Sequence, residues 1–228
     1  MTNITTLKAA CLVALALAAT SAIAATSKDL DEAMSRGGLQ KVAVKGLDLA
    51  YARPGATLAA YKRVTLDPVE VEFDTSWNPE RTGSRIKLSS DEREKIRAAV
   101  AKIVEEEFAK ALQKGGAYQI TNESAPDVLR VKAGIINLYV NAPSSAAAGR
   151  SRTYVSSAGR LTLVAELTDS ASGQLLARVA DRREANASSA RRIELADGMM
   201  NEGAARDVAS DWAQILRKAL DKARAVGS

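Results

Sequence analysis

The stretch at residues 89–116, SSDEREKIRAAVAKIVEEEFAKALQKGG, gives the clearest structural signal in the chain. It opens with a capping box, in which the Ser89 hydroxyl can accept a hydrogen bond from a free amide of the first turn while Glu92 reaches back. Apolar residues then recur at helical spacing, and two glycines end the pattern. We therefore predict a long amphipathic helix here. Its apolar stripe consists of Ile96, Val100, Ile103, Val104, Phe108, Ala111 and Leu112.

Segments with the alternation of β-strands lie on both sides of this helix. The apolar positions of residues 62–73 change phase around Pro68, which predicts a bulge at the proline. A change of phase near Gly134 predicts a second bulge. A turn at residues 169–173 between two alternating runs predicts a hairpin. The predicted extended segments cover residues 45–52, 62–73, 118–122, 128–140, 160–168 and 175–179.

A second amphipathic helix is predicted at residues 204–223, with Trp212 inside its apolar stripe and therefore in the core. Two such helices with several strands, mostly linked by hairpins, favour an α+β fold. We expect a two-layer sandwich in which both helices cover one face of a mostly antiparallel sheet and the other face is solvated. The 228 residues suit one domain. We place it at residues 42–225, after a flexible lead-in at residues 25–41.

The N-terminus has the three zones of a secretory signal peptide. Residues 1–8 are polar, residues 9–19 are apolar, and Ala22-Ile23-Ala24 offers small residues for cleavage after Ala24. The apolar run is shorter than the roughly 20 residues of a membrane span. An uncleaved anchor is the alternative. With residues 1–24 removed, we expect a periplasmic protein without a transmembrane span.

Residue types missing from the chain exclude much of the usual catalytic chemistry. The sole cysteine is Cys11, inside the predicted signal, and there is no histidine. Lys8 stands three positions before Cys11, where a lipoprotein signal carries an apolar residue, so we do not expect lipidation. Ser-His-Asp and Cys-His arrangements are excluded, and so are thiol ligands in the mature chain. We expect no cofactor and no metal site.

The surplus of positive charge lies in residues 150–192, which hold eight arginines against four acidic residues. A local arginine excess can steer anionic partners, and neighbouring arginines such as Arg182 and Arg183 can bind phosphate groups. We therefore take Arg178, Arg182 and Arg183 as tentative binding residues. A solvated sheet face is the plainer alternative. Nucleic acid is not expected as a partner, because aromatic residues do not interleave with the basic ones.

Acidic residues form two patterns that could carry chemistry. Glu70, Glu72 and Asp74 share one face of a predicted strand, where close carboxylates could bind calcium or act as an acid/base pair. Charge pairing across a solvated sheet explains them equally and is the interpretation we favour. The glutamate run at residues 105–107 is interpreted as a solvated helix face. Ser84 and Lys87 match the S-x-x-K pattern of penicillin-recognising enzymes, but the companion motifs S-D-N and K-T-G are absent.

One region resembles a known family. The matching runs are YARPG at residues 51–55, YKRV at 61–64, LDPVEV at 66–71, and Trp77. They resemble an uncharacterised family of exported Gram-negative bacterial proteins, domain of unknown function 3313, many of whose members look like lipoproteins. The resemblance covers most of residues 40–225 and implies no activity. Tyr51, Arg53 and Trp77 from this region join the tentative binding residues, Trp77 being either a contact residue or a lid over the edge of the core.

These observations favour a non-enzymatic interaction or accessory protein of the cell envelope. Its partner would be another envelope protein or an anionic envelope component, and its oligomeric state is left open. It would use the open sheet face, Trp77 and the loop at residues 142–152. One alternative is a binder of a small anionic ligand or glycolipid, with a pocket beside the tentative arginines. Another is a hydrolase using the carboxylates or Ser84 with Lys87.

Overall fold

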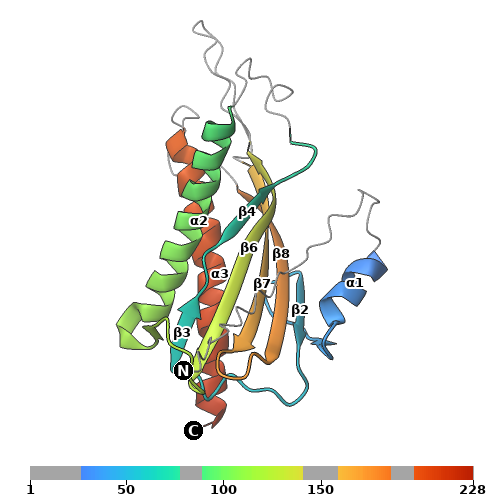
Figure 1. Cartoon of the computed structure of the whole chain (residues 1–228), viewed down its shortest axis with the longest axis vertical. Coiled ribbons are helices and arrows are strands. Elements are labelled where there is room, and N and C mark those ends of the chain that lie inside the picture. Colours follow the sequence, from blue (N-terminus) through green and yellow to red (C-terminus); the bar gives the residue numbers. More distant parts are fainter. Residues whose placement is uncertain (1–26, 78–88, 141–158, 186–197, 228) are drawn as a thin grey trace, which may run out of the picture. The chain divides into compact units, whose positions relative to one another are not determined.

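The computed structural model describes residues 27–77, 89–140, 159–185 and 198–227 (Figure 1). The chain forms two units, Met1–Ala33 and Met34–Ser228, and helix α1 (Ser27–Ser35) crosses the boundary between them. Everything below concerns the second unit. The predicted signal peptide, the loop at residues 142–152 and the Ser84–Lys87 pair lie outside the described residues.

Eight strands form one mixed, mostly antiparallel sheet, so the predicted α+β class is confirmed. Its order is β1-β2-β8-β7-β6-β3-β5, and β4 pairs with β6 where β3 has ended. The strands are β1 (Gln40–Lys41), β2 (Leu49–Ala52), β3 (Arg63–Leu66), β4 (Glu70–Phe73), β5 (Gln119–Ile120), β6 (Val128–Val140), β7 (Gly159–Asp169) and β8 (Leu175–Ala185). The predicted hairpin is the β7–β8 pair.

Three pairings in this sheet are parallel. Strands β3 and β4 both run parallel to β6, and β3 also runs parallel to β5. Helix α2 (Ser90–Gln113) connects β4 to the strands that follow. A connection of this length through a helix returns the chain in the same direction, which is why the pairing is parallel.

Of the two bulges predicted from the sequence, the structure contains the one at Pro68 but not the one at Gly134. Leu66 pairs with Val131 but Glu70 pairs with Gly134, so one extra residue lies between β3 and β4, as predicted from Pro68. Gly134 itself is regularly paired, and the prediction of a bulge there was wrong. The irregularity of β6 lies at Asn137, whose φ of 53° is in the left-handed region. Asparagine tolerates that conformation better than most residues, so the alternation shifts three positions later than expected.

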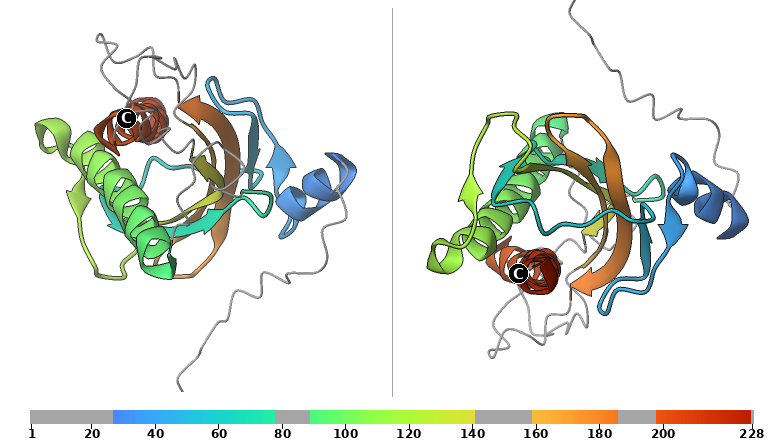
Figure 2. Two further views of the ribbon diagram at one scale, coloured as in Figure 1. Left: turned by 90° about the horizontal axis from the view of Figure 1, so that it is seen from above. Right: turned by 90° about the horizontal axis from the view of Figure 1, so that it is seen from below.

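Two long helices pack side by side against one face of the sheet (Figures 1 and 2). Ser89 caps α2 through the predicted capping box with Glu92. Helix α3 spans Gly198–Gly227, longer than the predicted 204–223. Among the described residues, no helix is long and apolar enough to cross a bilayer. The largest fully buried side chains belong to Trp212, Leu112, Leu129, Ile135, Leu220, Val64, Val104, Val128 and Val131.

The opposite face of the sheet is only partly solvated, which corrects the expectation of one fully wet face. Met34, Leu39, Tyr51 and Ala180 form a separate small core on that side of β1, β2 and β8. The ordered core therefore begins at Met34 rather than at residue 42, and the end of the predicted flexible lead-in is packed.

Candidate functional site

Two of the tentative binding residues, Tyr51 and Arg53, make structural contacts on β2. Tyr51 is 3% exposed, inside the small core. The Arg53 guanidinium donates to the carbonyl oxygens of Leu175 at 2.7 Å and Gly37 at 2.9 Å, and the Arg53 amide donates to Leu176. Arg53 thus joins β2, β8 and the chain before β1. A ligand contact by either residue stays a prediction.

Trp77 lies just beyond β4 and is 7% exposed. Its ring stacks on Phe73 with 4.3 Å between centroids and 5° between planes, and its Nε1–H donates to the Val140 carbonyl at 2.9 Å. The guanidinium groups of Arg93 and Arg97 lie over the Trp77 and Phe73 rings. This is the position of a lid over the end of the core, one of the two alternatives for Trp77, and it leaves little of the ring for a partner.

The structure does not bring the three tentative arginines of β8 together. Arg178 and Arg182 lie on the sheet face opposite the long helices, and Arg183 lies on the helix face. Arg178 donates to Glu166 at 2.7 Å and to the Arg36 carbonyl at 3.0 Å. Arg182 is exposed, and within the described residues its guanidinium makes no hydrogen bond or ion pair. A single pocket shared by all three arginines is not compatible with this arrangement, and a ligand contact by any one of them stays a prediction.

Asp181 is a buried carboxylate, 3% exposed, on the helix face of β8. It accepts hydrogen bonds from the Asp48 amide at 2.9 Å and Trp212 Nε1 at 2.7 Å, and it pairs with Arg183. Arg183 also donates to the Gly46 carbonyl at 2.6 Å. The group joins β8, α3 and the segment before β2, so every contact around this charge is structural.

The predicted row of carboxylates does not form a paired acid/base site. Asp74 pairs with Arg160 at 3.1 Å and accepts from the Ser76 hydroxyl, and these bonds, Ser76 first, hold the pKa of Asp74 below its ordinary value. Glu70 and Glu72 are exposed, and no ion pair reaches them from the described residues. Within that same part of the chain, no group of three acidic, histidine or cysteine side chains could hold a metal ion.

The glutamate run on α2 is not simply a solvated face, which corrects the prediction. Glu107 is 3% exposed and pairs with Arg206 of α3 at 3.0 Å and with Lys110 at 3.5 Å. Glu105 accepts a hydrogen bond from the Val69 amide at 2.9 Å, in the break between β3 and β4. The two carboxylates thus join α2 to α3 and to the sheet.

Tyr61 and Asp169 form a part-buried contact that was not predicted from the sequence, although Asp169 opens the predicted turn at residues 169–173. The Tyr61 hydroxyl donates to Asp169 at 2.9 Å, at the start of the β7–β8 turn. Burial, with the bond to Asp169 adding to it, raises the pKa of Tyr61 to about 12. The Ser172 hydroxyl and amide hold the pKa of Asp169 below its ordinary value. The sequence signals for the pair are that Tyr61 belongs to the family-like region and that Asp169 begins a predicted turn.

Arg217 of α3 closes the C-terminal end of α2, a second contact that the sequence did not indicate. Its Nη1 donates to the carbonyl oxygens of Ala111, Leu112 and Lys114 at 3.0–3.2 Å. Its guanidinium lies over the Tyr118 ring, 5.2 Å from the centroid. These carbonyls have no partner within α2 itself, so the arginine serves as a cap from a neighbouring helix.

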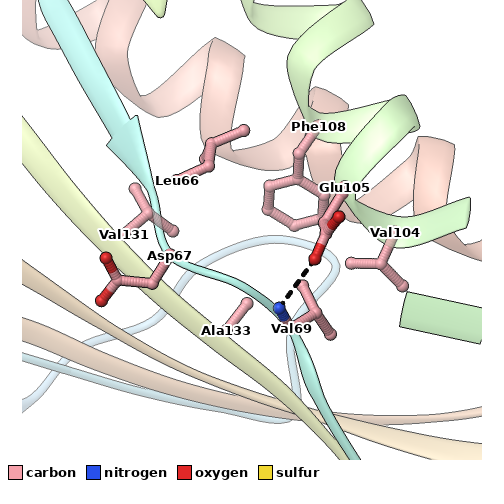
Figure 3. A pocket seen from close by; sticks show the side chains of 8 residues that line it. All are labelled: Leu66, Asp67, Val69, Val104, Glu105, Phe108, Val131 and Ala133. Atoms are coloured by element: carbon pink, nitrogen blue, oxygen red, sulfur yellow. Dashed lines mark hydrogen bonds between the residues drawn. The ribbon is translucent and has the colours of Figure 1, made fainter. Parts of the chain in front are cut away.

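A cavity lies between α2 and the break that separates β3 from β4 (Figure 3). Its volume is about 10 Å³, which is near the minimum for one water molecule. Glu105 points into this region and meets the Val69 amide (Figure 3). The lining residues are Leu66, Asp67, Val69, Val104, Glu105, Phe108, Val131 and Ala133. Such a space cannot admit an organic substrate.

The sheet face turned away from α2 and α3 is here called the outer face. Ala133, Ile135, Leu163 and Ala165 point into the main core, so their neighbours in β6 and β7 point outward. The outer face is lined by Glu70, Glu72, Lys132, Gly134, Ile136, Thr162 and Val164. The residues of β6 and β7 in this set are half-buried, and the two glutamates are exposed.

Comparison with known proteins yields one family. The sequence profile described as "Protein of unknown function (DUF3313)" matches residues 31–216. No curated protein matches the chain in sequence.

Solved structures resemble the chain distantly. Protein XCC0632 from Xanthomonas campestris is 9% identical with a TM-score of 0.40, over 76% of this chain and 93% of its own. The PelC dodecamer from Paraburkholderia phytofirmans is 11% identical with a TM-score of 0.37, over 74% and 96%. A putative neuraminyllactose-binding hemagglutinin homolog from Helicobacter pylori is 9% identical with a TM-score of 0.33, over 75% and 91%.

Proposed function

The chain belongs to the DUF3313 family of proteins of unknown function, and from that premise we propose that it is a non-enzymatic interaction or accessory protein of the bacterial cell envelope. Its binding surface is the outer face of the sheet. Its partner is another envelope protein.

The observation that carries this proposal is the incomplete covering of the sheet. Both long helices pack on one face, whereas the small core around Met34 and Tyr51 covers the β1–β2–β8 side of the other face and reaches Val164 of β7. Beyond Val164, the part over β6 and β4 keeps the half-buried Ile136 close to the charged side chains of Lys132, Glu70 and Glu72. An interface needs such a combination of apolar centre and polar rim.

The contacts of the ionisable groups support a role without catalysis. The buried carboxylates, Asp181 and Glu107, are each paired with an arginine and join elements of the fold. General acid/base catalysis needs a group that faces a substrate and has a pKa near the working pH. The side chains of Asp181 and Glu107 contact structural partners instead.

The alternative of a small anionic ligand receives less support. It relies on Arg178, Arg182 and Arg183, which lie on two faces of the sheet, and two of them already hold carboxylates. Of the three, Arg182 is the one whose guanidinium has no hydrogen bond or ion pair among the described residues.

Site-specific photo-cross-linking in intact cells tests the proposed surface. A photoreactive residue replaces Thr162 on the outer face, and the matched control places it at Lys218, which is exposed on α3. We expect discrete protein adducts from position 162 and none from position 218. Equal labelling from both positions, or no adduct from position 162, would contradict the proposal.

The envelope location has its own test. The predicted signal peptide implies that the mature chain begins at Ala25 and contains no thiol. Fractionation followed by mass spectrometry should recover this form from the periplasm, unreactive toward maleimide. Recovery of the full-length chain with Cys11 from the cytoplasm would contradict it.

A further inference from the structure

Strand β4 forms an edge of the sheet. On one side it pairs with β6, and on the other side no strand of the described residues accompanies it. Strand β5 covers the same edge farther down, beside β3, and ends there. An edge strand presents unpaired amide and carbonyl groups, which is the template for adding another strand.

The hydrogen bonds around β4 show which groups face outward. The Asp67 and Asp74 amides donate to carbonyl oxygens of β6, whereas the Val69 amide turns away and meets Glu105 of α2. Because direction alternates along a strand, the backbone groups of Val71 and Phe73 share the direction of Val69. Among the described residues no strand pairs with these groups, so two further positions for backbone hydrogen bonds face away from β6.

Helix α2 forms one wall beside this edge. Arg97 lies over the Phe73 ring at one end of β4, and Glu105 binds the Val69 amide at the other. Between them Ala101, one helical turn from each, packs against the core. Ala101 therefore contributes only a methyl group to the middle of the wall.

The charged residues on β4 indicate what kind of strand could pair with it. Glu70 and Glu72 stand on the outer face, exposed, and within the described residues they have no ion-pair partner, although Asp74 in the same row is paired with Arg160. On an adjacent strand, residues facing the same side would meet these carboxylates, and opposite charges at such positions are favourable. Residues facing the helix side would meet Val71 and Phe73.

We propose that β4 is a docking edge for an extended segment of a partner protein that alternates basic and apolar residues. The segment pairs with the backbone of Val71 and Phe73, and its basic side chains face Glu70 and Glu72. This inference rests on the proposed function as an interaction protein and names one of its surfaces.

A defined peptide tests the docking edge. The probe is a blocked octapeptide that alternates lysine and valine, and the comparison peptide has glutamate in place of lysine. Added to the full-length protein, the lysine peptide should bind and should slow hydrogen exchange of the Val71 and Phe73 amides, and the glutamate peptide should not. Failure of the lysine peptide to bind, or protection confined to other amides, would overturn the proposal.

Variants separate the edge from nonspecific charge. Glu70→Lys with Glu72→Lys should weaken binding of the lysine peptide about tenfold. Asp207→Lys with Asp211→Lys changes the net charge equally on the exposed side of α3 and should leave binding unchanged. Equal effects from the two double variants would overturn the proposal.

Hydrogen exchange of the protein alone is a further control. Protection of the Val71 and Phe73 amides at rising protein concentration, without peptide, would also overturn the proposal, because the added strand would then come from a second copy of the chain. Cross-linking from position 162 tests the envelope interaction separately, so either idea can fail alone.

Discussion

The buried side chain of Asp181 accepts two hydrogen bonds and forms an ion pair with Arg183. We expect the loss of its charge to lower the free energy of unfolding more than the loss of any other charge. Asp181→Asn keeps the shape but places an amide donor among donors and leaves Arg183 without its partner. We expect a loss of about 2 to 3 kcal/mol in the free energy of unfolding, measured by urea denaturation. Arg182→Ala, next to it but exposed, should change stability by less than about 0.5 kcal/mol. Equal effects of the two substitutions would show that the buried network contributes nothing.

Asn137 is the second residue with a specific requirement, because its φ is 53° in the bulge of β6. A β-branched residue is strained in this conformation, whereas glycine adopts it freely. Asn137→Val should lower the free energy of unfolding by about 1 to 2 kcal/mol, and Asn137→Gly should leave it within about 0.5 kcal/mol. Urea midpoints of both variants decide this. A valine variant as stable as the glycine variant would place the bulge elsewhere.

Single residues also show the limit of what the sequence could reveal. Burial of Trp212 follows from its place in a helical stripe, and so does the capping role of Ser89. Burial of Glu107 and Asp181 does not, because it depends on Arg206 and Arg183 and on elements brought close by folding. Periodicity reports which residues share a face, but it cannot report what a neighbouring element contributes to that face.

Among the elements, α2 and α3 are joined by a contact with a measurable consequence. Arg217 of α3 donates to three carbonyl groups at the end of α2. Arg217→Lys keeps the charge but loses the planar fork and the stacking on Tyr118. We expect the free energy of unfolding to fall by about 1 to 2 kcal/mol. Hydrogen exchange in the last turn of α2 should become faster. The exposed neighbour gives the control, since Lys218→Ala should alter neither quantity. Full rescue by lysine would mean that the charge alone stabilises the helix end.

The elements themselves were largely predictable, but their pairing was less so. The hairpin, the long strand at 128–140 and the bulge at Pro68 follow from alternation and turn residues. The parallel pairing of β3 and β4 with β6 does not, because alternation looks the same in parallel and antiparallel strands. The tentative site shows the same limit, since Arg178 and Arg183 lie on opposite faces once the register of β8 is fixed.

At the scale of the whole molecule, the covering of the sheet relates the fold to the proposed function. A two-layer fold needs one buried sheet face, and α2 and α3 supply it. The second face is free to serve an interface, and here the chain near Met34 has covered one side of it. The remaining part over β6, with the edge of β4 beside it, is the surface that we propose for a partner.

The stability of the whole protein should have a characteristic dependence on pH. With no histidine in the chain, we expect the free energy of unfolding to be nearly flat between about pH 5 and pH 8. In acid it should fall, because the folded state holds the pKa values of Asp74, Asp127 and Asp169 below their ordinary range, through Ser76, Arg63 and Ser172 respectively. Their contribution is present above the unfolded pKa of about 3.9 and is lost as the pH falls through the lower folded values.

At alkaline pH, Tyr61 makes the free energy of unfolding decrease as the pH rises, the opposite of the trend in acid. Burial raises its pKa from 10 to about 12, so between these values the unfolded chain has lost a proton that the folded chain keeps. The contribution of Tyr61 to stability is therefore complete below pH 10 and is lost as the pH rises toward 12. Urea midpoints measured from pH 3 to pH 12 should show the plateau and both declines, and Tyr61→Phe should shallow the alkaline decline without moving the acid one. A transition between pH 6 and pH 7 would contradict the expectation, because the chain has no histidine.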